Sequence, residues 1–110
     1  MDGDVIVGYL RRLDGVDDEA VRQLVRTLRD FADLKGLVLT MVFVEREPGR
    51  TSTLGTMTRY CLRHGVRRVV VPSGLHLNRL PGLAFLSREL LAQSIGGQVW
   101  IATEGEGEDT

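Results

Sequence analysis

Four short apolar runs alternate with three longer amphipathic segments along this chain, and the alternation limits the folds that the sequence can adopt. The apolar runs are residues 4–10, 37–45, 67–72 and 98–103, and turn residues bound them. Such runs are typical of strands that are covered on both faces. The strand and helix order therefore predicts a small three-layer α/β domain. We expect a mainly parallel four-stranded sheet, right-handed crossovers and helices on both faces.

The segments between the predicted strands have helical spacing and suitable terminal residues. Asp17, Asp18 and Glu19 place negative charge at the start of the first helix, and Gly36 ends it. Thr53 is expected to cap the second helix and Gly65 to end it, and the third helix falls within residues 80–97. The positions expected to face the core are Val21, Leu24, Val25, Leu28, Ala32, Leu34, Leu54, Met57, Tyr60, Cys61, Leu62, Leu83, Leu86, Leu90 and Leu91, with Trp100 on the last strand.

Length and composition indicate one domain. The chain has 110 residues, of which 43% are hydrophobic, and this is enough for a single core. We expect one α/β domain over residues 1–103 and a disordered acidic tail over 104–110, which contains no apolar residue. Cys61 is the only cysteine, which excludes an internal disulfide and favours a cytoplasmic protein. Because no apolar run reaches roughly 18 residues and the chain starts with acidic residues, neither membrane insertion nor export is expected.

Positive charge is concentrated in the middle of the chain although the net charge is only −1. Residues 46–88 contain eight arginines and a single acidic residue, Glu47. A segment of this kind is compatible with nucleic acid or another acidic partner. It is also compatible with ordinary solvated helix faces. The sequence leaves both interpretations open.

In a parallel sheet of this kind, functional residues gather beyond the carboxyl ends of the strands. The residues that follow the first three predicted strands include several arginines, whose guanidinium groups can bind phosphate in a bidentate manner. The phosphate or DNA candidates are Arg11, Arg12, Arg46, Arg50 and Arg79. His64 and His76 are the only histidines, and no cluster has metal-ligand spacing, so no metal is expected. No glycine-rich phosphate loop is present either, and no cofactor is predicted.

Three short motifs at these strand ends resemble the N-terminal catalytic domain of the serine recombinases, the resolvase and invertase family. That family begins with a strand that carries Tyr-x-Arg-x-Ser, and this chain has Tyr9, Arg11 and, at the nucleophile position, Leu13. A second motif, Phe-x-(Asp/Glu)-x-x-Ser-Gly, corresponds to residues 43–49, where Pro48 replaces the serine. The third motif, Asp-Arg-Leu-x-Arg, corresponds to residues 75–79. Leu75 and His76 replace its first two residues, and Arg79 is retained.

The resemblance implies a recombinase fold without the recombinase reaction. The family joins a serine oxygen to a DNA phosphate while arginines stabilise the phosphoryl charge. Leu13 has no hydroxyl, and Thr51, Ser52 and Ser73 lie at other positions, so we do not expect them to replace it. His76 would add positive charge only when protonated. The leading hypothesis is an inactive domain that acts as a protein-interaction or regulatory module.

Two other function classes remain open on the sequence. A DNA-associated recombinase relative could hold the phosphate backbone through its arginines without cutting, and such binding would be weak and non-specific. An enzyme of unrelated chemistry is disfavoured because no pair of catalytic groups is visible.

The predicted third helix carries more apolar residues than one core-facing stripe requires. Part of its surface should therefore be exposed in a monomer, which favours a homo-oligomer or a protein partner. The interface candidates are Leu83, Phe85, Leu86 and Leu90.

Overall fold

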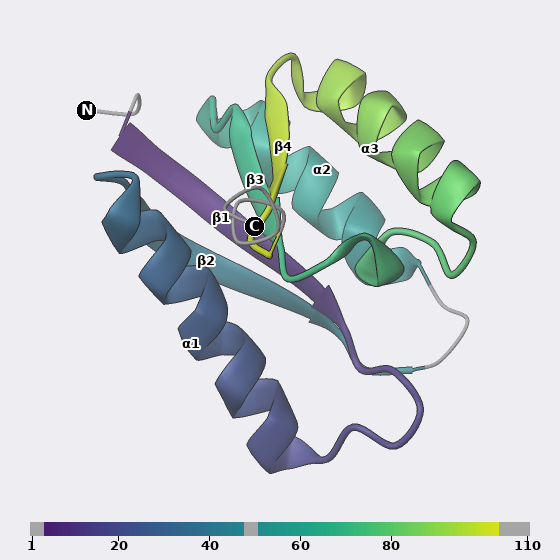
Figure 1. The fold of residues 1–110 in the computed structure, drawn as a ribbon. Coiled ribbons are helices and arrows are strands. Elements are labelled where there is room, and N and C mark those ends of the chain that lie inside the picture. Colours follow the sequence, from purple (N-terminus) through teal and green to yellow (C-terminus); the bar gives the residue numbers. More distant parts are fainter. Residues whose placement is uncertain (1–3, 48–50, 104–110) are drawn as a thin grey trace, which may run out of the picture.

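The computed structural model of the chain describes residues 4–47 and 51–103. Four strands alternate with three α-helices, as the sequence predicted (Figure 1). The elements are β1 (Val5–Arg11), α1 (Asp18–Leu34), β2 (Val38–Glu45), α2 (Ser52–His64), β3 (Arg68–Val71), the short 3₁₀ helix η2 (Gly74–His76), α3 (Pro81–Ile95) and β4 (Gln98–Ile101). Pro48, Arg50 and the predicted tail 104–110 lie outside the described residues.

All strand pairs of the sheet are parallel, and the strand order is β2-β1-β3-β4. This confirms the predicted α/β class. The chain moves from β1 to β2 in one direction across the sheet and then returns past β1 to β3 and β4. Because crossovers of one handedness place their helices on opposite faces when the direction reverses, α1 covers one face and α2 and α3 cover the other (Figure 1).

The core has one layer on each face of the sheet. Ile6 and Leu10 of β1 pack with Leu28 of α1, whereas Val7 and Tyr9 belong to the cluster on the α2 and α3 side. This alternation follows from the two-residue repeat of a strand. Gly8 allows α1 to approach β1 closely, because a Cβ at this position would lie 2.7 Å from Leu28 Cδ1.

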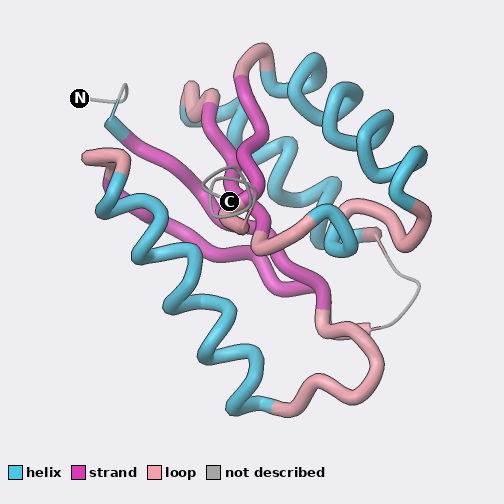
Figure 2. The backbone as a smooth tube through the Cα atoms, viewed as in Figure 1, coloured by secondary structure: helices cyan, strands magenta, loops and turns pink. Residues whose placement is uncertain are grey.

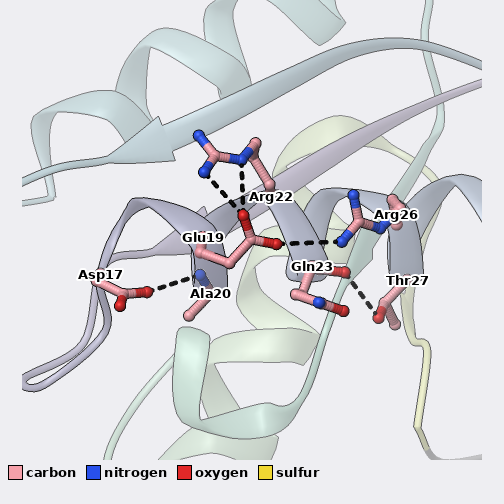
Figure 3. A network of polar contacts seen from close by, with 7 residues as sticks. All are labelled: Asp17, Glu19, Ala20, Arg22, Gln23, Arg26 and Thr27. Carbon is pink, nitrogen blue, oxygen red and sulfur yellow. Dashed lines mark hydrogen bonds and ion pairs between the residues drawn. The ribbon is translucent and has the colours of Figure 1, made fainter.

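The termini of α1 follow the sequence prediction. Asp17 is the N-cap, and its carboxylate accepts a hydrogen bond from the Ala20 amide at 2.8 Å (Figure 3). Glu19 bridges Arg22 and Arg26 on the exposed surface of the same helix (Figure 3). Gly36 follows the helix with φ +71°, a conformation that glycine adopts at little cost.

Several apolar positions expected in the core are instead exposed, and α3 shows the largest difference. Leu83, Leu86 and Leu90 are 45%, 51% and 54% exposed, and Leu91 is the only predicted leucine of this helix that is buried. The helix turns Ala84, Leu91 and Ile95 inward. Because α3 is apolar on most of its circumference, its sequence does not determine which face of the helix is buried. Packing against the sheet and η2 determines it. Leu34 and Leu62 also point to solvent, near the ends of their helices. Within the described residues, no helix is both long and apolar enough to cross a membrane.

Candidate functional site

The carboxyl ends of β1 and β3 lie at the point where the strand order reverses, which is where open parallel sheets bind ligands. The loops that leave this edge can be followed in Figure 2. A pocket of about 540 Å³ opens there, between the end of β1 and the connection from η2 to α3. Its lining consists of Arg11, Arg12, Leu13, Asp14, Glu47, Leu75, Asn78, Arg79 and Leu80. We call it the arginine pocket.

Arg11 connects the end of β1 to two other predicted site residues. Its backbone N–H donates to Nδ1 of His76 at 2.9 Å, and its Nε donates to the Tyr9 hydroxyl, also at 2.9 Å. The guanidinium carbon lies 5.8 Å from the centre of the Tyr9 ring. Tyr9 itself is fully buried, and burial raises the pKa of its hydroxyl. The arginine is thus held at the pocket by contacts on both its backbone and its side chain.

His76 is a buried hydrogen-bond acceptor, not a positive charge. It is 3% exposed, and burial, followed by the charge of Arg11, lowers its pKa to about 4. The hydrogen bond from the Arg11 backbone requires Nδ1 to be unprotonated. At neutral pH, His76 therefore does not supply the positive charge of the arginine in the recombinase motif, a contribution that the sequence made conditional on protonation.

Glu45, at the end of β2, caps α2 in place of the predicted Thr53. Its Oε1 accepts hydrogen bonds from the backbone amides of Thr53 at 2.9 Å and Leu54 at 3.3 Å. The same oxygen accepts from the Tyr9 hydroxyl at 3.4 Å, and Oε2 lies 3.5 Å from the Ser52 hydroxyl. Thr53 is inside the helix, where its amide needs an acceptor. The carboxylate is 3% exposed and joins β1, β2 and α2.

Nearby carboxylates partly balance the positive charge of the arginine pocket. Arg12 pairs with Asp18 at 3.2 Å, and its Nε donates to the Val16 carbonyl oxygen at 2.9 Å. Arg79 pairs with Asp14 at 3.7 Å. The described lining contains three arginines and two carboxylates, those of Asp14 and Glu47.

Arg46 lies apart from the arginine pocket. It lines a smaller hollow of about 190 Å³ with residues of the β2 end and the α2 start, Ser52 among them. The structure thus brings Arg11, Arg12 and Arg79 together, whereas Arg46 is separate. Arg50 and Pro48 are outside the described residues.

No hydroxyl or thiol belongs to the described lining of the arginine pocket, and Leu13 and Leu75 contribute apolar side chains to it. The sequence at positions 48–50 is Pro-Gly-Arg and adds no hydroxyl either. Cys61 is buried on the α2 side of the sheet, where burial raises its pKa to about 11. Among residues 4–47 and 51–103, no group of three or more His, Cys, Asp or Glu side chains could hold a metal ion.

Sequence reasoning missed two residues of this site. Asp14 and Asn78 line the pocket, and neither was among the residues that the sequence singled out. Asn78 Oδ1 accepts the Leu80 amide at 3.0 Å and so orders the approach to α3. Asn78 stands shortly before Pro81, the first residue of α3. An asparagine just before a helix that starts with proline is a local signal that could have indicated this turn.

No family model and no curated protein matches the sequence. A solved structure does match: the C-terminal catalytic domain of ISC1926 TnpA, an IS607-like serine recombinase, with a TM-score of 0.70 and 19% identity. The match covers 96% of this chain and 76% of that chain. The chain has the fold of a serine recombinase catalytic domain. In this serine recombinase fold, Tyr9, Arg11 and Leu13 lie on or directly after the central strand β1, and Leu75, His76 and Arg79 face them from the segment after β3.

Proposed function

We propose that the chain is a catalytically inactive serine-recombinase-like domain that acts as a protein-interaction or regulatory module. The observation that supports this best is the arginine pocket, because Leu13, which the motif resemblance aligns with the family nucleophile, contributes an apolar side chain to its lining. The described lining has no hydroxyl or thiol that could attack a phosphate. Ser52 is held near Glu45 and lines the other hollow. Because nucleophilic attack tolerates displacements of only about 1 Å, Ser52 does not substitute for the missing serine.

The surface of α3 supports a role in protein interaction. Leu83, Leu86 and Leu90 form an exposed stripe at helical spacing, and Phe85, which is 65% exposed, lies on another part of the helix surface. Exposed apolar side chains in such a group are typical of interaction surfaces. Carboxylates partly balance the positive charge of the arginine pocket. Strong binding of a polyanion is therefore a weaker candidate for the role of this edge of the sheet.

Self-association is the first expected consequence. We predict a homodimer or larger assembly at high micromolar concentration that dissociates on dilution, measured by light scattering across a dilution series. Leu86→Glu or Phe85→Glu should weaken it at least tenfold, because a charge would be buried in an apolar interface. Leu62→Glu, at an exposed leucine of α2, is the matched control and should leave the assembly unchanged. A monomeric mass at all concentrations would contradict self-association.

A second candidate function is phosphate-backbone binding without cleavage, as in a DNA-associated recombinase relative. The convergence of Arg11, Arg12 and Arg79 on one pocket favours it. Duplex DNA should then bind weakly and without sequence preference, and the affinity should fall steeply as salt rises.

Replacing Arg11 and Arg79 together by alanine should lower the DNA affinity several-fold in a fluorescence anisotropy titration. The matched control combines Arg22→Ala with Arg26→Ala. These two arginines lie on α1 and do not line the arginine pocket. Equal losses for the two double variants, or no binding at low salt, would count against this second function.

A further inference from the structure

A second pocket, which we call the α3 pocket, lies beside the arginine pocket and shares part of its lining. It has a volume of about 330 Å³ and is formed by η2, the connection from η2 to α3, α3 itself and the end of β4 (Figure 1). Concave and mostly apolar sites of about 300–1,000 Å³ with a few polar groups typically bind small molecules. The described lining consists of Gly74, Leu75, Asn78, Arg79, Pro81, Ala84, Phe85, Arg88 and Ile101.

Most of the α3 pocket is apolar, and part of its apolar wall is open to solvent. Leu75 and Phe85 are 51% and 65% exposed. Pro81, Ala84 and Ile101 complete the apolar lining. A ligand that covers this wall would remove apolar surface from water, and the free energy of that transfer favours binding.

The charged part of the α3 pocket is positive. Arg79 and Arg88 are the charged residues of its described lining, which contains no carboxylate. The Arg88 side chain is oriented by a hydrogen bond that its Nε donates to the Val99 carbonyl oxygen at 2.8 Å. The α3 pocket therefore complements a ligand that combines an apolar body with a negative charge.

Arg79 lies on the boundary between the two pockets and already faces a carboxylate. It lines both pockets and pairs with Asp14 at 3.7 Å, a distance too long for a hydrogen bond. Both side chains are about three-quarters exposed (75% and 79%), and an exposed pair of this kind contributes little to stability. A ligand carboxylate that makes two parallel hydrogen bonds to the guanidinium can therefore replace Asp14 at small cost.

We propose that the α3 pocket binds a small amphipathic carboxylate. Its apolar body covers Leu75 and Phe85, and its carboxylate takes the place of Asp14 on Arg79. The inference goes beyond the proposed function, which assigns no small-molecule ligand to the domain. A duplex phosphate backbone has no apolar body to cover the exposed wall, so the lining of the α3 pocket favours a small ligand over DNA.

Titration of the full chain with 2-naphthoate, followed in amide NMR spectra at low salt, tests the site. We expect saturable shifts at residues 74–79, at Phe85 and at Ile101. Two matched ligands separate the two parts of the site: 2-naphthamide has the rings without the charge, and acetate has the charge without the rings. Each should bind at least about fivefold more weakly than 2-naphthoate, because it lacks one of the two contributions. Equal affinity for either matched ligand, or no saturable shifts at these residues, would overturn the proposal.

Two substitutions in the exposed ion pair should change the affinity for 2-naphthoate in opposite directions. Arg79→Gln removes the guanidinium and should weaken binding about fivefold, whereas Asp14→Asn removes the competing carboxylate and should strengthen binding about threefold. Arg22→Gln and Glu19→Gln alter an exposed ion pair of α1 and are the matched controls, which should change the affinity less than twofold. An Arg79→Gln protein that binds like its control, or weaker binding by Asp14→Asn, would overturn the assignment of the carboxylate to Arg79.

The apolar wall is tested by Phe85→Ala, which should weaken binding of 2-naphthoate about fivefold because the ligand loses apolar contact area. Leu83→Ala, at an exposed leucine of α3 outside the described lining of the pocket, is the matched control and should change the affinity less than twofold. Failure of these tests would leave the proposed function standing, because that function requires no small-molecule ligand. Equal effects of Phe85→Ala and Leu83→Ala would overturn the assignment of the apolar body to this wall.

Discussion

Replacing Glu45 by alanine is expected to lower the free energy of unfolding by about 3 kcal/mol, since one buried and two partly buried donors lose their acceptor at once. Oε1 accepts the Thr53 and Leu54 amides and lies within 3.4 Å of the buried Tyr9 hydroxyl. In Glu45→Ala, the first turn of α2 loses its cap, and the Tyr9 hydroxyl keeps only the hydrogen bond from Arg11. Loss of a cap alone costs about 1 kcal/mol, and the unpaired buried hydroxyl adds to that cost.

Urea unfolding monitored by circular dichroism measures this effect. Glu45→Gln is expected to cost less than half as much, because the amide oxygen can still accept the two backbone amides. Glu89→Ala, an exposed carboxylate on α3, is the control and should change stability by no more than about 0.5 kcal/mol. A Glu45→Ala protein as stable as the control would contradict the capping role.

Acidification from pH 7.5 to pH 5 is expected to destabilise the domain by about 2 kcal/mol through His76 alone. The fold lowers the pKa of His76 to about 4 from the ordinary 6.5, mainly by burial. Between these values the unfolded chain binds a proton that the folded chain excludes, so stability falls as the pH falls through this window. Below pH 4 both states are protonated, and the loss reaches its full size, on the order of 3 kcal/mol.

The His76 contribution is isolated by comparing unfolding at the two pH values in three proteins. In His76→Asn, the amide oxygen can accept the Arg11 amide without titrating, so the drop should shrink by most of the 2 kcal/mol attributed to His76. His64→Asn changes an exposed histidine at the end of α2 and should leave the drop unchanged. The same drop in His76→Asn and wild type would show that His76 is not the group responsible.

The α/β class could be predicted from the sequence because its signals are local. Strand runs, Asp17 at a helix start and the glycines at helix ends each act within a few residues. The orientation of α3 could not be predicted in the same way. Its leucines surround the helix, so only contact with the sheet and η2 decides that Ala84, Leu91 and Ile95 are buried.

The site could be predicted in part for a related reason. Parallel strands deliver their carboxyl ends to one edge, which is why Arg11 and Arg79 were expected near each other. The partners of these residues depend on distances across the fold: Arg79 meets Asp14, and the Arg11 backbone meets His76 across 65 residues of sequence. Glu45 was recognised as a motif residue, but its capping of α2 required the relative placement of β1, β2 and that helix.

The central claim, a serine-recombinase fold without the recombinase nucleophile, is tested most directly by searching for a covalent protein–DNA adduct. The full chain is incubated with supercoiled DNA that carries varied sites, and the products are separated after denaturation. We expect no adduct and no strand cleavage from the wild type. Leu13→Ser should not restore either, because Leu75 and Pro48 also depart from the family motifs. An adduct formed by the wild-type chain would contradict the claim.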